Sequence, residues 1–152
     1  MRHLTAILLM VCFTVALPSA SHAIDLWHSN TLWLNQGMCA FTFTLDGQSI
    51  LFDASTDGGV RDLTLEIMLL DEDRDELGSP QTIRLSEPFA DSEATRYAQF
   101  VIEGDCSAET FGIAKAAGII GGKQRDLLEI RQLTPTKFEP KGIILPAKYS
   151  EE

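Results

Sequence analysis

Histidine is scarce in this sequence, and its scarcity excludes several kinds of catalytic and metal site. Of the three histidines in 152 residues, His3 and His22 fall in an N-terminal segment that is expected to be removed. His28 is then the only imidazole of the mature chain. A zinc site built from several histidines is excluded, and a Ser-His-Asp triad would have to use His28 beside the mature N-terminus. Because no Gly-x-Ser-x-Gly motif occurs either, we expect no enzyme activity and no cofactor or metal.

Positive charge is also scarce, which bears on the partners that the protein can bind. Twelve Lys and Arg stand against 22 Asp and Glu, for a formal net charge of −10. The basic residues are scattered singly among acids, whereas nucleic-acid binding needs a basic stripe, so no nucleic-acid partner is expected. The many acids leave a paired-carboxylate glycosidase open in principle. A domain of this size, however, offers little room for a deep substrate cleft.

Long hydrophobic runs are absent except near the N-terminus. Residues 4–16 are apolar, follow a short basic start and precede the small-residue site Ser21-His22-Ala23. These are the three regions of a secretory signal peptide, and the apolar run is too short for a permanent membrane anchor. Cys12 lacks the small residues that a lipoprotein carries just before its cysteine. We therefore expect residues 1–23 to be a signal peptide for the Sec pathway, and residues 24–152 to form one unanchored domain, periplasmic or secreted.

Only two cysteines, Cys39 and Cys106, remain after the signal peptide is removed. An even number in an oxidising compartment predicts a single disulfide bond, with a buried pair of free thiols as the alternative. The bond would close a loop of roughly 68 residues, which the chain-entropy estimate values at about 4 kcal/mol of stability.

Strict alternation of apolar and polar residues is what the sequence has in abundance. In residues 38–45 the apolar side chains share one parity, and therefore one face of a strand. The same pattern recurs in residues 63–70 and, less regularly, in residues 94–103. The residues predicted to face the core from these strands are Cys39, Phe41, Phe43, Leu45, Leu63, Leu65, Ile67, Leu69, Ala98, Phe100 and Ile102.

Further short strands are predicted between turn signals. They cover residues 82–85, 111–120, 123–133 and 138–145, while residues 26–34 could form a strand or a strapped-down arm. Gly121-Gly122 is typical of a tight hairpin turn, and residues 49–52 are expected to be irregular. Residues 107–117 are the nearest helical candidate, which Gly112 weakens. Seven or eight short strands without a long amphipathic helix predict an all-β sandwich.

The acidic stretch after residue 70 has the alternating carboxylates of a calcium loop, in Asp71, Asp73 and Asp75. Glu76 stands where an EF-hand needs glycine, and Thr82 stands where the bidentate glutamate belongs. The sequence therefore favours a solvated hairpin tip here.

Four apolar residues are the candidate contacts with a partner or within a dimer. Trp27 and Trp33 are of the type that concentrates in binding hot spots, although at least one of them is expected to fill the core. Met68 and Leu70 lie on the nominal outer parity of a central strand, where apolar side chains indicate a covered face. A homodimer would cover it.

Three motifs together resemble one family. They are Asp25-Leu26-Trp27 at the mature start, Gly37-Met38-Cys39 opening a strand, and residues 122–128, Gly-Lys-Gln-Arg-Asp-Leu-Leu. They resemble the interleukin receptor mimic protein A (IrmA) family of pathogenic Escherichia coli. The resemblance implies a fibronectin type III-like or immunoglobulin-like sandwich, a homodimer formed by strand exchange, and binding of host interleukins by imitation of their receptors, as a virulence function. It transfers no individual binding residue.

The alternative interpretation is an interaction module of the bacterial envelope, associated with pili or secretion. Such a module would accept a strand at an exposed sheet edge. A pilus-assembly chaperone would need a second sandwich domain, for which this chain is too short.

Overall fold

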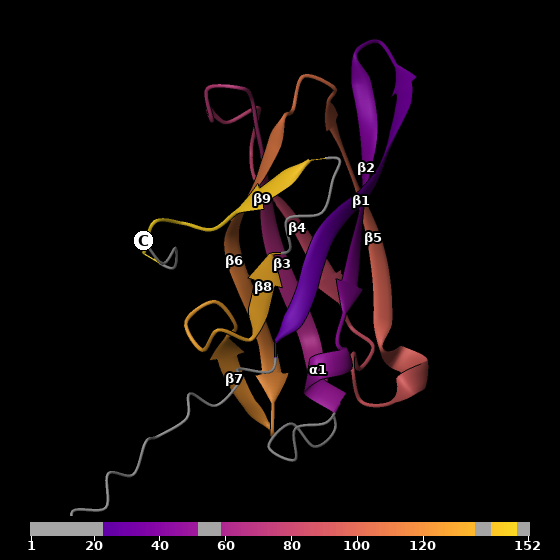
Figure 1. The fold of residues 1–152 in the computed structure, drawn as a ribbon, viewed down its shortest axis with the longest axis vertical. Helices are drawn as coiled ribbons and strands as arrows, with labels where there is room; N and C mark the ends of the chain where they lie inside the picture. Colours follow the sequence, from indigo (N-terminus) through magenta and orange to yellow (C-terminus); the bar gives the residue numbers. More distant parts are fainter. Residues whose placement is uncertain (1–22, 52–58, 136–140, 149–152) are drawn as a thin grey trace, which may run out of the picture.

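Two β-sheets packed face to face make up the part of the chain that the computed structural model describes, namely residues 23–51, 59–135 and 141–148 (Figure 1). The elements are β1 (Ile24–Asn35), β2 (Met38–Asp46), α1 (Gln48–Leu51), β3 (Val60–Leu70), β4 (Gln81–Leu85), the 3-10 turn η2 (Glu93–Thr95), β5 (Tyr97–Asp105), β6 (Thr110–Ile120), β7 (Lys123–Asp126), β8 (Leu133–Pro135) and β9 (Gly142–Ile144). The predicted all-β sandwich is confirmed. The described residues form nine strands where seven or eight were expected, because the single strand predicted at residues 123–133 is replaced by β7 and the separate short strand β8.

The strand order explains how the ends of the chain are held. One sheet has the order β5-β2-β1-β8, and the other has β4-β3-β6-β7 with β9 beside β6. All neighbours are antiparallel except β1 with β8 and β6 with β9. The short strands β8 and β9 are therefore parallel additions beside β1 and β6, and antiparallel pairs supply the rest of both sheets.

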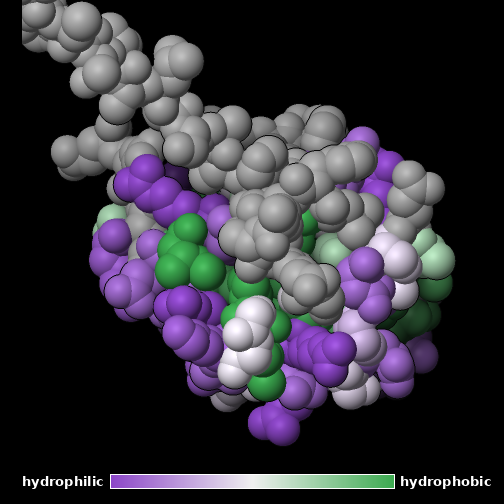
Figure 2. Space-filling view, turned by 90° about the horizontal axis from the view of Figure 1, so that it is seen from below, coloured by the Kyte–Doolittle hydropathy of each residue, from purple (hydrophilic) through white to green (hydrophobic). Residues whose placement is uncertain are grey.

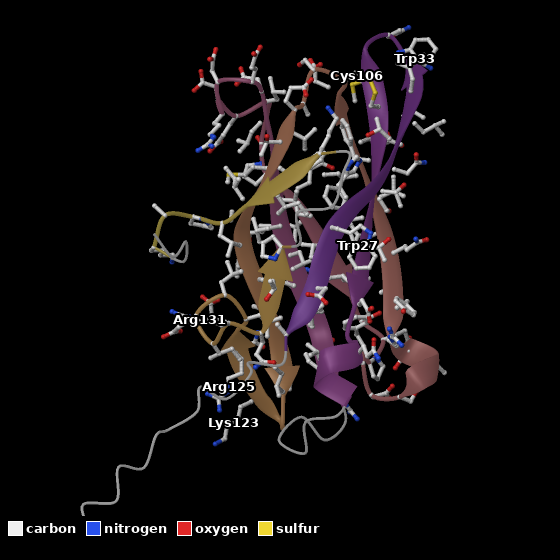
Figure 3. The ribbon with its side chains drawn as sticks, in the orientation of Figure 1. Trp27, Trp33, Cys106, Lys123, Arg125 and Arg131 are labelled. Carbon is white, nitrogen blue, oxygen red and sulfur yellow. A yellow bond between two sulfur atoms is a disulfide. The ribbon has the colours of Figure 1, made fainter. Side chains whose placement is uncertain are left out.

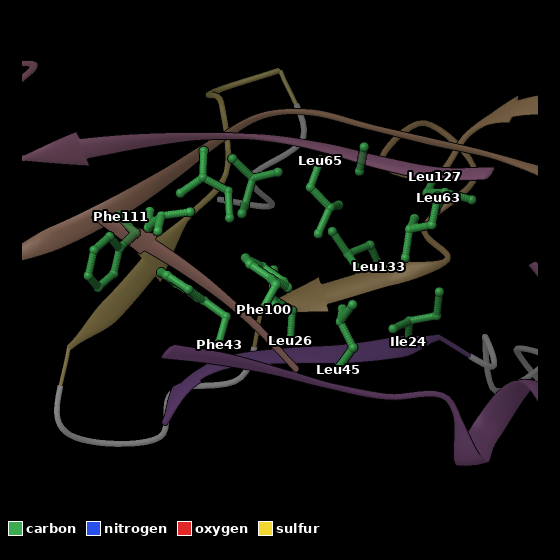
Figure 4. Close-up of a cluster of buried hydrophobic side chains, with 14 of the residues drawn as sticks. Ile24, Leu26, Phe43, Leu45, Leu63, Leu65, Phe100, Phe111, Leu127 and Leu133 are labelled. Carbon is green, nitrogen blue, oxygen red and sulfur yellow. The ribbon is translucent and has the colours of Figure 1, made fainter. Parts of the chain in front are cut away.

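The core lies between the sheets and follows the predicted parity closely (Figure 4). Phe111 of β6 packs edge-on against Phe41 and Phe43 of β2, with ring centroids 5.1 and 4.8 Å apart. Phe43 also stacks on Phe100 of β5 at 5.2 Å. Burying each such side chain contributes on the order of 2 kcal/mol. Of the residues predicted to face inward, all are buried except Ala98, which is half-buried against the core.

The strand predicted for residues 123–133 ends early, at Asp126. The carboxylate of Asp126 accepts hydrogen bonds from the backbone N–H groups of Leu128 (3.0 Å) and Glu129 (3.2 Å), which turns the chain. The turn buries Leu127 and Leu128 side by side, an arrangement that an alternating strand cannot give. Gly121 and Gly122 do form the predicted turn, with φ angles of 56° and 75°.

Residues 107–117 contain no helix, since β6 begins at Thr110. The stretch at residues 49–52, predicted to be irregular, instead contributes to the single turn α1 (Gln48–Leu51). The predicted strand at residues 138–145 shortens to β9, and its first three residues lie outside the described residues.

The predicted disulfide bond is present and joins Cys39 of β2 to Cys106, with the two Cα atoms 5.0 Å apart. Cys106 follows the last residue of β5, and its N–H donates to the carbonyl of Gly37 at 2.9 Å. The bond therefore fastens the β1–β2 turn to the end of β5, across a sequence separation of 67 residues.

Replacing both Cys39 and Cys106 with alanine should lower the free energy of unfolding by about 4 kcal/mol, because the unfolded chain regains the entropy of an open loop. Urea unfolding followed by fluorescence measures this change. The control is the unmodified protein in the presence of reductant, whose unfolding midpoint should shift toward that of the double variant. An unchanged midpoint in both cases would show that the bond does not constrain the unfolded chain.

Gly59 provides a second test of the packing between β3 and the segment before η2. Its φ is +66°, and a Cβ there would lie 2.4 Å from the carbonyl oxygen of Phe89 and 2.6 Å from the N–H nitrogen of Asp91. Gly59→Ala should destabilise the fold by more than about 1 kcal/mol. Gly142→Ala is the matched control, since its Cβ would meet nothing within 4 Å, and should stay within about 0.5 kcal/mol of the parent in the same urea titration.

Candidate protein-binding surface

Exposed large hydrophobic side chains gather on one sheet. Among the described residues, five of the six belong to the neighbouring strands β1, β2 and β5, and the sixth is Ile130. The five are Leu32 (59% exposed), Trp33 (66%), Met38 (39%), Tyr97 (57%) and Val101 (52%). We call these five residues the apolar face. Scattered exposed hydrophobic residues are normal, but here five lie on three adjacent strands, which makes this sheet the candidate binding surface.

The register of the strands orders the apolar face. Leu32 pairs with Ala40, and Val101 pairs with Thr42, so both lie on the parity opposite to the buried Phe41. Trp33 pairs with Cys39 and shares the other parity. Figure 3 places Trp33 at the free end of the β1–β2 hairpin, close to Cys106. Leu32, Met38, Tyr97 and Val101 therefore lie on the outer side of the sheet, whereas Trp33 lies on the opposite side, at the tip of the hairpin.

Uncharged hydrogen bonds hold the three strands together beneath the apolar face. The Thr44 hydroxyl is almost fully buried, donates to Ser29 Oγ at 3.1 Å and accepts from the side chain of Gln99 at 3.1 Å. Ser29 Oγ in turn donates to the carbonyl of Thr42. Trp27 pairs with Thr44 in the register and is half-buried. The centre of the sheet is therefore a rigid platform without formal charge.

An ion pair fixes one margin of this platform. Arg96 donates to Asp46 at 2.9 and 3.2 Å, and its guanidinium lies 4.5 Å from the centre of the Tyr97 ring. Burial alone would raise the pKa of Asp46, but the hydrogen bonds from Arg96 and from the Gln48 N–H outweigh it and lower that pKa. The ionised pair holds the Tyr97 ring in place on the apolar face.

The four candidate contacts predicted from the sequence differ in exposure. Trp33 is open to solvent, while Trp27 and Met68 are half-buried and Leu70 is only 4% exposed. Neither tryptophan belongs to the buried core, so the expectation that one of them fills it is wrong. Leu70 and Met68 lie instead over Gly112 of β6, whose missing side chain leaves room for them.

Leu70 is therefore covered within its own chain and offers a partner no surface in this arrangement. Contact of the other three with a partner stays a prediction. Leu32 and Met38 were missed by the sequence, because pattern alone gives their parity and not whether another element covers them. Tyr97 and Val101 could have been found, since both stand on the outward parity of a predicted strand.

The acidic tip between β3 and β4 is organised by its own backbone. Asp71 accepts hydrogen bonds from the N–H groups of Asp73 (2.9 Å) and Asp75 (2.8 Å), so its carboxylate stabilises the turn. Within the described residues, no three His, Cys, Asp or Glu side chains are grouped to hold a metal ion.

The opposite end of the molecule carries basic residues. Figure 3 shows Lys123, Arg125 and Arg131 there, and Figure 2, which looks onto this end, shows its hydrophobic side chains surrounded by hydrophilic ones. Lys123 and Arg125 belong to β7, an edge strand. Charged side chains on an edge discourage pairing with other chains, so we assign them this role.

The described residues form a small disulfide-bonded β-sandwich of the fibronectin type III and immunoglobulin-like class. Residues 24–134 match the family of interleukin receptor mimic protein A. The chain belongs to this family, IrmA, as the three sequence motifs predicted. A solved structure of IrmA from Escherichia coli is 27% identical, with a TM-score of 0.57, and the match covers 78% of this chain and 94% of that one. No curated protein matches the sequence.

No helix in the described part of the chain is long and apolar enough to cross a membrane.

The two tryptophans should report their different surroundings in fluorescence. Trp33→Phe removes the solvent-exposed indole, so the remaining emission should shift to shorter wavelength and acrylamide should quench it less. Trp27→Phe is the matched variant. Its emission should shift to longer wavelength, and acrylamide should quench it more. Equal quenching of the two variants would contradict the exposed hairpin tip.

Proposed function

We propose that this protein is an exported, non-catalytic binding protein that engages host interleukins through its apolar face and so modulates the immune response. The observation that carries this proposal is the gathering of exposed hydrophobic side chains on three adjacent strands of a disulfide-bonded sandwich. Membership of a family named for imitation of interleukin receptors supports the choice of partner. A disulfide bond that persists in the native state fits export, because such bonds form in oxidising compartments.

Trp33 is the proposed centre of the contact. It is the most exposed large hydrophobic residue of the described chain and lies at the end of a hairpin, where it can enter a pocket of a partner. Aromatic anchors of this kind carry much of the energy of protein interfaces. Leu32 and Met38 lie on the same hairpin but on the opposite side of the sheet from Trp33, so a partner that takes up the hairpin tip would contact all three, with polar residues of β2 and β5 as the rim.

A homodimer would complete this function, because receptor modules of this class grip a helical cytokine at the elbow between two sandwiches. An open edge supports dimerisation. β8 pairs with β1 only over Ile24–Leu26, and within the described residues no strand pairs with the outer edge of residues 30–35. An exposed strand edge is a template for pairing with another chain, by addition or by exchange of strands.

The same edge favours the second candidate function, an envelope module that accepts a strand from a pilus or secretion component. That function needs the backbone of residues 30–35 and not the apolar side chains. Substitution of side chains therefore distinguishes the two functions.

Trp33→Ala should weaken binding to immobilised interleukins by at least tenfold, which corresponds to about 1.4 kcal/mol or more. Ile130→Ala is the matched control, since Ile130 is also exposed but belongs to no part of the apolar face. It should change the affinity by less than twofold. Surface plasmon resonance with a panel of interleukins measures both, and unchanged thermal unfolding shows that both variants are folded. Equal binding by the two variants, or no binding to the panel, would contradict the proposal.

The exported chain should sediment as a dimer at tens of micromolar in analytical ultracentrifugation. If strands are exchanged, dissociation requires partial unfolding, so subunits of two differently labelled preparations should mix only over hours. If a monomer binds interleukins, binding does not require an elbow between two sandwiches, and that part of the proposal is wrong. A monomer that does not bind them would favour the envelope module.

A further inference from the structure

His28 lies fully buried between the two sheets, in contact with the aromatic core. Its ring centroid is 5.1 Å from that of Phe111 of β6, and 5.6 and 6.1 Å from those of Phe43 and Phe41 of β2. Among the described residues it is the only ionisable side chain in the buried class, which otherwise contains the polar residue Thr44 and apolar residues. A buried group of this kind is costly unless its hydrogen bonds are satisfied, so its role deserves an explanation.

The hydrogen bonds of His28 fix its protonation. Nε2 lies 2.8 Å from the carbonyl oxygen of Asn30 and 3.0 Å from Oγ1 of Thr31. A carbonyl oxygen can only accept, so Nε2 carries the proton and the ring is in that tautomer. Nδ1 then presents a lone pair, and it is buried without a hydrogen-bond partner in the described structure. A second proton on Nδ1 would place an N–H and a full charge against aromatic rings.

The Asn30 carbonyl belongs to an irregularity in β1. His28 pairs with Phe43 and Asn30 pairs with Thr42, so Ser29 is an extra residue that interrupts the ladder. Such a bulge bends a strand and re-aims the residues beyond it. Those residues, 30–35, form the arm of the hairpin that carries Leu32 and Trp33. The imidazole of His28 holds the bulge from the inside, and through it the arm.

The charged surroundings oppose a second proton on His28. The rings of β2 and β6 that pack against it belong to phenylalanines, and Thr31 presents a neutral hydroxyl. The charged group that faces it is Lys141, just before β9, which donates to the carbonyl of Ala108 and pairs with Glu109 at 3.6 Å. Burial lowers the pKa of His28 below its ordinary value of 6.5; the hydrogen bond to Asn30 raises it in part, and Lys141 lowers it further.

We propose that His28 is a positioning residue, which holds the hairpin arm in its binding arrangement while the imidazole is neutral and releases it in mild acid. The part of this proposal that concerns interleukin binding rests on the proposed function above. The part that concerns the arm does not. The result is a binding surface that is formed at neutral pH and lost, reversibly, in an acidified compartment.

The direction of the pH effect follows from proton linkage. Above pH 6.5 the imidazole is neutral in the folded and opened chains alike, so it contributes no pH dependence. As the pH falls below 6.5 the opened chain takes up a proton first. The equilibrium constant for holding the arm then falls by up to about tenfold per pH unit, until the pH reaches the lowered pKa of the folded state.

The test follows the arm and its stability without any partner. In the protein purified after export, NMR of the His28 ring, the Trp33 indole and the Leu32 methyl groups between pH 7.5 and 4.5 should give one common midpoint below 6.5. His28→Gln retains an N–H donor for Asn30 without a titrating ring. In this variant the NMR signals of the arm should stay constant over the titration. Below pH 6.5 its free energy of unfolding, measured in urea, should fall less steeply with pH, because unfolding takes up one proton fewer.

Asp25 requires a control because burial, with a contribution from Asp46, raises its pKa. Asp25→Asn should keep the arm midpoint of the parent. Arm signals that titrate equally in His28→Gln, or a His28 midpoint at or above 6.5, would overturn the proposal. If His28→Gln fails to fold, the NMR titration of the parent protein alone decides between these outcomes.

Binding to the interleukin panel separates this proposal from the proposed function. If the parent loses affinity between pH 7.5 and 5.5 while His28→Gln retains at least a third of its neutral affinity, both hold. If the parent binds equally at both values, the positioning role is wrong and the proposed function stands. If neither protein binds at any pH but the arm still titrates through His28, the positioning role stands and the proposed function is wrong.

Discussion

The contact of Phe111 with Phe41 and Phe43 is the interaction on which the rest of the structure depends. It joins β6 of one sheet to β2 of the other, with ring centroids about 5 Å apart. The buried imidazole of His28 packs against the same three rings. Edge-to-face aromatic pairs of this kind add to the stability of area burial and also fix relative orientation. The two sheets therefore have one well-defined alignment.

The outer faces of the two sheets differ, and the difference carries the functional argument. On the β3–β6 sheet, apolar outer residues are covered by the same chain, as Leu70 and Met68 over Gly112 show. On the β5-β2-β1 sheet the apolar residues stay open, over a platform of hydrogen-bonded Ser, Thr and Gln side chains. Composition alone cannot separate these cases, since both sheets have hydrophobic residues on their outward parity. Only the neighbours in space decide which face is free.

The sequence predicts the fold where one physical signal dominates. Alternation in β2, β3 and β5 is strict, because one face of each strand is buried and the other is wet, and the inward residues there are those predicted. The disulfide followed from counting cysteines. The short strand β8 could not be predicted, because three residues carry no period and its pairing is decided by a distant strand, while β9 was predicted but too long. The expectation that a tryptophan fills the core failed for a similar reason. A large side chain is usually buried, but both tryptophans lie on a sheet to which the described residues add no third layer.

For the candidate surface, sequence reasoning found Trp33 but also proposed Leu70, which is buried. It assigned His28 no role, since a single histidine near a mature N-terminus fits no catalytic pattern. The signal that could have identified His28 is that no catalytic or metal-binding pattern explains it. An ionisable residue within an alternating apolar strand needs a partner, and here the partner is the carbonyl of Asn30, directly after the bulged residue Ser29.

The disulfide has a consequence for recognition as well as for folding. It fastens the β1–β2 turn to the end of β5, and the N–H of Cys106 holds the carbonyl of Gly37 beside it. A protruding hairpin would otherwise sample many orientations and would have to give up that freedom when a partner ordered it. Here the freedom is already removed before any partner arrives, so more of the contact energy of the hairpin tip is available as affinity. Under the proposed function, each sandwich would in this way bring a preorganised hairpin tip to the partner.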